Sequence, residues 1–440
     1  MNATSENTLR DLAVTFGAKM CAIFLTYGVQ VVLARTLEPT GRGSYDASLI
    51  LATALLVALN PGAEMATLFF ITSRRLPYSQ GVTAGLTLTL LAGIVAMFAG
   101  LVLMLAPLPI MAGILTKASS LEFMLGLATI PSTLMLQTCL SIANARKDYI
   151  YLAGLQIGRR VVALLLVITF VAWLRYGVAG ALTSVIAGEW LLVYACLAHF
   201  RSRHGWQRGL PSRSDLLALL RYGARYYLGK LGNFVNFKLG ALVLAFLATT
   251  EELGYYGQAL AIAIQFLAVS DSVFLILLPR VAECADGGAE LIARALRLTF
   301  LLGLVVMAPI FVFAEPLFLL SFSAAFLPSV APFQILVLGF FLRSLGKTVE
   351  PFLIGTNRPG SVSLSIAVGL VANLALLFYL YPRWGIVGAA WALVANYAAS
   401  TLLLLLFYTR KSGIALARIW LVTGDDLTAV QAAVRRLGNR

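Results

Sequence analysis

Eight basic residues lie inside long apolar segments of the sequence. Each such charge costs about 2.5–3.5 kcal/mol at the centre of a membrane-spanning helix. These residues must therefore line water or pair with acids, and a confined group of cations can replace the hydration shell of an anionic phosphate group. All but Lys238 fall in the half of their segments nearer the cytoplasmic face, a depth suited to an anionic headgroup. The eight are Lys19, Arg159, Arg160, Arg225, Lys230, Lys238, Arg343 and Lys347.

Six of these cations are candidates for binding an anionic substrate. Arg159 and Arg160 are adjacent and lie deep in one segment, so helical geometry points them about 100° apart. We expect at least one of them to face a cavity, while the other caps carbonyl groups or meets an acid. Cations near a helix end, such as Lys19, Arg225 and Lys347, can instead extend to the membrane surface. The candidate set is Arg159, Arg160, Lys230, Lys19, Lys238 and Arg343.

Acids inside the apolar segments are candidates for coupling to ions, because a carboxylate in a low-dielectric cavity can bind a proton or a sodium ion. The alternative is local ion pairing. Glu350 is three residues from Lys347, and Asp46 lies near Arg42, so we expect pairing for these two acids. Both interpretations stay open for the three remaining acids, which are Glu64, Asp271 and Glu189.

The composition excludes a soluble, secreted or disordered chain. Of 440 residues, 60% are hydrophobic and 12% are charged, whereas a soluble domain carries roughly 25% charged residues. The four cysteines and two histidines lack the spacing of metal ligands or of a disulfide framework. We therefore expect no metal site, no structural disulfide and no cofactor.

Twelve apolar runs are each long enough to cross about 30 Å of hydrocarbon as a helix. Runs such as residues 164–170 are continuous and do not alternate as the strands of a membrane barrel do. The predicted class is an all-α integral membrane protein with 12 transmembrane helices, and Pro61 should kink the second one. The runs are residues 12–34, 44–72, 81–105, 120–143, 150–173, 177–200, 222–249, 255–279, 292–314, 328–354, 361–381 and 386–409.

The distribution of lysine and arginine between the runs predicts the orientation. Twenty of these residues lie on the side that holds both termini and five on the other, so both termini should be cytoplasmic. The net charge of +14 then acts as a topology signal and attracts anionic membrane lipids. No basic segment with interleaved aromatic residues is present, so we expect no nucleic-acid partner.

The two halves of the chain resemble each other at an offset of about 211 residues. Parallel repeats of an even number of spans predict two parallel six-helix lobes around a central cavity. We expect the matched glycines Gly43 and Gly254 to let the chain turn tightly between helices. The matches are Gly43 with Gly254, Tyr45 with Tyr256, Lys19 with Lys230, Arg146 with Arg358, and residues 177–182 with 385–390.

The longest polar interruption, residues 199–215, separates the predicted lobes. A first six-helix lobe should cover residues 1–205, and a linker or interfacial helix should cover 206–221. The second lobe should cover residues 222–410, followed by a cytoplasmic tail at 411–440.

Residues 33–71, LARTLEPTGRGSYDASLILATALLVALNPGAEMATLFFI, resemble the start of the polysaccharide transporter or oligosaccharide flippase family. This family belongs to the multidrug/oligosaccharidyl-lipid/polysaccharide flippase superfamily. The resemblance extends through the 12-span plan, the repeat and the similar starts of spans six and twelve. Glu38 stands where the family's first loop usually has glycine.

The resemblance implies a flippase that moves undecaprenyl-pyrophosphate-linked oligosaccharide repeat units across the bacterial inner membrane. The units would serve the synthesis of exopolysaccharide, O-antigen or capsule. The implied mechanism is alternating access, with neither enzymatic chemistry nor a cofactor. The implied partners are the lipid-linked oligosaccharide, membrane lipids and polysaccharide polymerase or glycosyltransferase machinery, while the glycan stays unspecified.

Three other functions are weighed against this one. An ion-coupled multidrug antiporter usually handles cations, which eight intramembrane bases against five acids would repel. A glycan polymerase or ligase needs a sizeable loop outside the membrane, and the outer connections here are short. A sugar transporter of the major facilitator type has a Gly-Asp-Arg-rich loop, in place of which this chain has residues 72–81.

Overall fold

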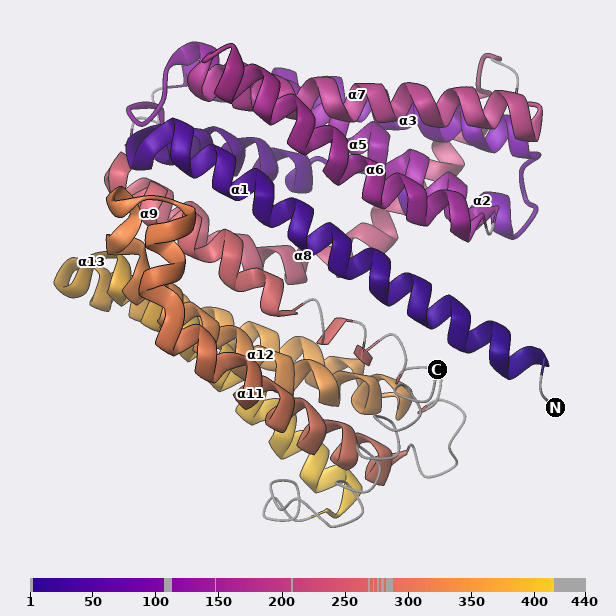
Figure 1. The fold of residues 1–440 in the computed structure, drawn as a ribbon. Helices are drawn as coiled ribbons and strands as arrows, with labels where there is room; N and C mark the ends of the chain where they lie inside the picture. Colours follow the sequence, from indigo (N-terminus) through magenta and orange to yellow (C-terminus); the bar gives the residue numbers. More distant parts are fainter. Residues whose placement is uncertain are drawn as a thin grey trace. The chain divides into compact units, whose positions relative to one another are not determined.

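The computed structural model of the protein is built from helices (Figure 1). It describes residues 3–106, 113–146, 148–206, 209–267, 270–271, 273–274, 277, 281 and 288–414, but not the side chains of residues 3–19, 149 and 227–239. The helices are α1 (Ala3–Ala58), α2 (Ala63–Thr72), α3 (Tyr78–Leu105), α5 (Ser120–Ala145), α6 (Tyr149–Val167), α7 (Gly177–His204), α8 (Arg213–Leu247), α9 (Thr250–Ala263), α11 (Ala289–Ser321), α12 (Val330–Gly355) and α13 (Pro359–Ser412).

Large apolar side chains lie on the outside of these helices, as expected for a protein surrounded by lipid. Leu105, Ile150 and Val305 are 86%, 90% and 70% exposed. Within the described residues, eight helices are long and apolar enough to cross a membrane. The all-α membrane class is thereby confirmed. The total of 12 spans stays a prediction, although α1 and α13 each join two predicted spans through one non-helical residue.

The non-helical residue of α1 is Glu38, which has φ 57° and ψ 174°. Almost only glycine adopts this region, because a Cβ atom clashes there, and other residues incur a strain of about 1–3 kcal/mol. Pro39 follows and disfavours the helical conformation at the residue before it. The chain therefore bends at the position where the family that it resembles usually has glycine.

The second predicted span, residues 44–72, is broken rather than kinked, so the expectation of one continuous helix is wrong. Helix α1 ends at Ala58 and α2 begins at Ala63. Between them, the side chain of Asn60 accepts a hydrogen bond from the backbone of Gly62 at 2.7 Å, and Gly62 has φ 67°. A Cβ atom on Gly62 would lie 2.4 Å from the carbonyl oxygen of Gly223 in α8. Pro61 and the close approach of α8 together account for the break.

Two places in the chain show the internal repeat in the backbone. Gly177 and Gly385, which are 208 residues apart, precede equivalent sequences and have positive φ values of 58° and 54°. When the 211-residue offset is added, the bend at Glu38 matches residue 249, where the chain passes from α8 to α9. These matches support the repeat, and the six-plus-six division stays a prediction.

Gly43 and Gly254 do not form turns, so this expectation is wrong. Both lie inside helices, and neither has a positive φ. A Cβ atom on Gly43 would lie 1.7 Å from the carbonyl oxygen of Thr250, and one on Gly254 would lie 1.9 Å from that of Pro39. The two glycines therefore permit close packing of the start of α9 against the second half of α1.

The chain forms two compact units, each described here by itself. The first comprises residues 1–258 and 321–326, and the second comprises residues 259–320 and 327–440. Helix α8 is continuous from Arg213 to Leu247, so the predicted interfacial helix and seventh span form one helix that packs with the first unit. The predicted lobe limits at residues 206–221 stay a prediction. Helices α3, α5 and α7 share a core in the first unit, and α12 packs along α13 in the second.

Replacing Glu38 by glycine should stabilise the protein, because glycine adopts this backbone region without a clash. Relief of the backbone strain should outweigh the greater conformational entropy that glycine gives the unfolded chain. We therefore expect the thermal unfolding midpoint in detergent to rise by the equivalent of about 1 kcal/mol. Thr36→Gly is the matched control at an exposed helical position, and it should lower the midpoint. A lower midpoint for Glu38→Gly than for the unmodified protein would contradict the strain.

Candidate functional site

A cavity of about 180 Å³ lies within the first unit, lined by α1, α6 and α7. Gln30 and Tyr45 line it from α1, Arg159 and Arg160 from α6, and Glu189 from α7. The cavity that the repeat predicts between two lobes stays a prediction. The cavity found here is formed by one unit alone and contains both adjacent arginines.

Glu189 is a buried carboxylate of the cavity and is held by three side-chain donors. It is 5% exposed, and both of its carboxylate oxygens accept hydrogen bonds. Oε1 accepts one from Arg159 at 2.7 Å, and Oε2 accepts one from Ser132 at 2.8 Å and one from Thr133 at 2.7 Å. A buried carboxylate needs such donors because burial removes its water. Since Ser132 and Thr133 belong to α5, one carboxylate joins α5, α6 and α7.

Arg160 lines the same cavity from the next position of α6. Within the described part of the chain, no carboxylate pairs with Arg160, and its side chain is exposed. As the helical geometry predicts, one of the two arginines meets an acid. Both line the cavity of the first unit, while the expectation that they face a cavity between two lobes stays a prediction. Their role in substrate binding stays a prediction.

Arg42 holds the amide of Gln30, a residue that lines the cavity. Arg42 is 3% exposed and donates to Gln30 Oε1 at 2.6 Å and to Asp46 Oδ2 at 3.0 Å. Its guanidinium also lies 5.4 Å from the centre of the Tyr45 ring. Because the amide oxygen of Gln30 is occupied, the two N–H groups are left as donors. The predicted pairing of Asp46 with Arg42 is confirmed, and Arg42 is buried.

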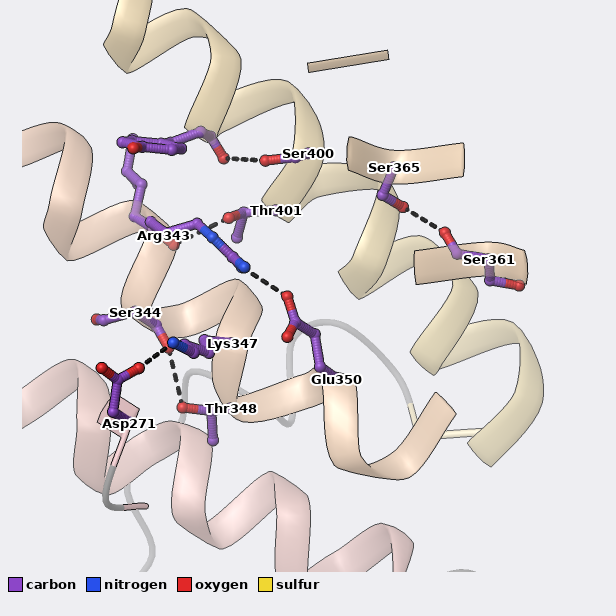
Figure 2. A network of polar contacts seen from close by, with 12 residues as sticks. Asp271, Arg343, Ser344, Lys347, Thr348, Glu350, Ser361, Ser365, Ser400 and Thr401 are labelled. Carbon is purple, nitrogen blue, oxygen red and sulfur yellow. Dashed lines mark hydrogen bonds and ion pairs between the residues drawn. The ribbon is translucent and has the colours of Figure 1, made fainter. Parts of the chain in front are cut away.

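The second unit contains two ion pairs along α12 (Figure 2). Arg343 Nη1 lies 2.7 Å from Glu350 Oε1, and Lys347 Nζ donates to Asp271 Oδ1. The predicted pairing of Glu350 with Lys347 is therefore wrong. Arg343 and Glu350 are two turns apart on one helix face, and both are less than 10% exposed, whereas Lys347 reaches an acid from another segment. Two bases meet two acids, so this group is locally neutral.

The comparisons with known proteins agree with this architecture. The sequence model of the polysaccharide biosynthesis protein family matches residues 32–331, which is more than half of the chain. The chain belongs to this family. The resemblance noted from residues 33–71 is thereby confirmed.

One curated relative is described as a probable low-salt glycan biosynthesis flippase, Agl15, of Haloferax volcanii. It is 22% identical over 200 residues, which cover 44% of this chain and 42% of the relative, so the match spans less than half of the relative's length. Its described activity is therefore only a guide for this member of the family.

Two solved structures have a similar fold. The lipid II flippase MurJ in an inward closed conformation has a TM-score of 0.71 at 13% identity, over 98% of this chain and 96% of MurJ. An inward-facing multidrug resistance transporter of the MATE family has a TM-score of 0.68 at 17% identity, over 91% of this chain and 98% of the transporter. At these identities the likeness establishes an all-α membrane transporter fold.

The remaining predicted residues either lie apart from the cavity or have side chains that the structure does not describe. Glu64 is buried in the first turn of α2, where the helix dipole favours a carboxylate. Arg225 is exposed on α8. The side chains of Lys19, Lys230 and Lys238 lie outside the described residues, as do residues 415–440 of the predicted tail.

Sequence patterns did not indicate the uncharged polar residues at the cavity and around Glu189. Gln30 and Tyr45 line the cavity, whereas Ser132 and Thr133 donate to Glu189 from α5. Such residues cost little to place in a membrane helix, so they do not stand out as a buried charge does. The adjacent hydroxyls of Ser132 and Thr133 after Pro131 are the one sequence signal that could have indicated a polar helix face.

The pairing of Arg159 with Glu189 should be measurable as a coupling energy. In a double-mutant cycle of Arg159→Gln and Glu189→Gln, we expect about 1–2 kcal/mol, because Arg159 is 37% exposed and water screens part of the attraction. The measurement is denaturant unfolding of the solubilised protein. Arg213→Gln, which changes an exposed residue of α8, should be additive with Glu189→Gln. Additivity of the Arg159 and Glu189 substitutions would contradict the pairing.

Proposed function

We propose that this protein is a flippase that moves undecaprenyl-pyrophosphate-linked oligosaccharide repeat units across the bacterial inner membrane by alternating access. The observation that carries the proposal is the intramembrane cavity with Arg159 and Arg160, of which Arg160 has no carboxylate partner among the described residues. Membership of the polysaccharide biosynthesis family and the relative described as a probable glycan flippase support it. The Lys and Arg distribution supports cytoplasmic termini.

The chemistry of the cavity suits one end of such a substrate. Guanidinium groups bind phosphate oxygens through paired N–H donors, and a low-dielectric site strengthens the attraction. Gln30 and Tyr45, which line the cavity from α1, add neutral polar groups. A volume of about 180 Å³ is below the roughly 300–1,000 Å³ of sites that enclose a whole small ligand. The cavity would therefore hold the pyrophosphate, with the glycan and the prenyl chain outside it.

Glu189 allows the cavity to exist in two charge states. With Glu189 ionised, the three charges of Arg159, Arg160 and Glu189 sum to +1. A proton or a cation on Glu189 would raise this sum to +2 and release Arg159 for the substrate. Re-formation of the Arg159–Glu189 pair would then favour release of the substrate. Asp271, which pairs with Lys347, and Glu64 are the other acids that we propose for ion coupling.

The same cavity argues against an ion-coupled multidrug antiporter. An excess of positive charge repels the cations that drug antiporters usually carry. Flipping requires binding and movement but no bond breaking, so the proposal assigns no catalytic residue. We propose a polysaccharide polymerase as a partner because it would use the flipped unit as its own substrate.

Arg160→Gln should reduce flipping about 10- to 100-fold, because one charge-assisted contact contributes about 1.5–3 kcal/mol. The measurement uses proteoliposomes that contain a fluorescent undecaprenyl-pyrophosphate saccharide and follows its arrival in the opposite leaflet. Arg160→Lys should retain intermediate activity, since it keeps the charge but loses the paired donors. Arg213→Gln, away from the cavity, is the matched control. Equal rates for Arg160→Gln and Arg213→Gln would overturn the assignment of the cavity.

Glu189→Gln should bind the substrate more tightly and lose the response of transport to a gradient, because glutamine mimics the neutral acid. The measurement is the flipping rate in the same proteoliposomes with an imposed proton or sodium gradient. Glu251→Gln, at the start of α9, should keep the response of the unmodified protein. An unchanged gradient response in Glu189→Gln would exclude Glu189 from coupling.

A further inference from the structure

A second polar cluster lies where α6 begins and α7 ends, apart from the residues of the cavity. Asp148 precedes α6, and His199 and His204 lie in the last turns of α7. The chain has two histidines, and both belong to this cluster. One potential ligand atom from each of the three residues lies within 4.8 Å of the other two. Two imidazoles and a carboxylate in this arrangement have the composition of a transition-metal site.

The local structure holds two of the ligands in place. Asp148 Oδ1 accepts the backbone N–H of Tyr151 as a helix cap, which leaves Oδ2 at 3.2 Å from His199 Nε2. The ring of Tyr151 stacks on His199 with centroids 3.7 Å apart and an angle of 8° between the planes. The carboxylate and the first imidazole are therefore oriented before any ion binds.

The end of α7 is fixed as well, which positions His204. Gly205 ends the helix with φ 63°, and the next residue, Trp206, donates from Nε1 to Thr83 in α3 at 3.1 Å. The ring of His204 meets that of Tyr78 edge-on at 5.6 Å. His204 thus belongs to a structured helix end, and its ring lies 5.5 Å from that of His199.

We propose that Asp148, His199 and His204 bind a divalent transition-metal ion of the zinc class. Tetrahedral zinc has bonds of about 2.0–2.2 Å to nitrogen and oxygen, which places its ligand atoms about 3.4 Å apart. The 3.2 Å between Asp148 and His199 already agrees with this spacing. Because the three ligand atoms lie within 4.8 Å of one another, the third ligand needs to move inward by at most about 1.4 Å, which a side chain at a helix end can do. Imidazole ligands favour zinc, copper or nickel over magnesium and calcium.

Arg146 competes with the metal. Its Nη2 atom lies 3.5 Å from His204 Nδ1, at the outer limit of a hydrogen bond, and its side chain is exposed. The guanidinium must move away before a cation binds, so it weakens the site. A metal ion would link the first turn of α6 to the last turn of α7. The proposal does not depend on the proposed substrate.

The test uses the full-length protein with a histidine-free affinity tag, stripped with a chelator and kept in detergent. Cys21 and Cys284 are changed to serine to remove other ligands. We expect one Zn²⁺ per chain by calorimetry and a tetrahedral visible spectrum with Co²⁺. His199→Phe keeps a ring to stack on Tyr151, and Asp148→Asn keeps a helix cap; each should weaken binding about tenfold or more. Arg146→Ala should tighten it.

Three results would overturn the site. These are no stoichiometric Zn²⁺ binding by the unmodified chain, undiminished affinity in His199→Phe and His204→Phe, or an octahedral Co²⁺ spectrum that the substitutions leave unchanged. Unfolding midpoints of the variants establish that a loss of binding is not a loss of fold. Arg160→Gln should bind Zn²⁺ like the unmodified chain, so failure of the metal site and failure of the flippase assignment are distinguishable.

Discussion

Charged groups in an apolar environment need a partner or water, and this requirement governs the polar interior of the protein. The second unit meets it by neutralisation, since Arg343 and Lys347 each meet an acid. The first unit meets it differently, because Glu189 binds Arg159 while Arg160 remains at the cavity. A site with one surplus positive charge can bind an anion, whereas a balanced group chiefly stabilises its own packing. This difference is the physical reason for proposing that the substrate binds at the first unit's cavity.

The strained bend at Glu38 makes part of this cavity possible. Gln30 and Arg42 are 12 residues apart, and in a straight helix their backbones would be separated by about 18 Å. Their side chains nevertheless form a hydrogen bond of 2.6 Å because the chain bends between them. The strain of a non-glycine residue at φ 57° is thus offset by contacts that orient a donor at the cavity. A bend of the same kind at Gly385 involves no side-chain strain.

The sequence predicted what depends on composition and on local spacing. The membrane class, an acid partner for one of the two adjacent arginines and the pairing of Asp46 with Arg42 all follow from hydropathy and helical geometry. The partners of Glu350 and Lys347 and the hydroxyl donors to Glu189 depend on which helices pack together, which local spacing does not specify. The break at Asn60–Gly62 likewise requires α8 to lie against it. Tertiary contacts therefore decided each point on which the prediction was wrong or incomplete.

Helices α6 and α7 are joined at two levels, and this connects the two proposed sites. Arg159 and Glu189 pair at the cavity, while Asp148 and His199 interact at the end of the same helices. The two contacts are separated by 10 or 11 residues on each helix, or roughly 16 Å. A relative shift of the helices by one turn, about 5.4 Å, exceeds the reach of either hydrogen bond and would break both. An ion bound between Asp148 and His199 would oppose such a shift and would thereby favour the arrangement in which Glu189 holds Arg159.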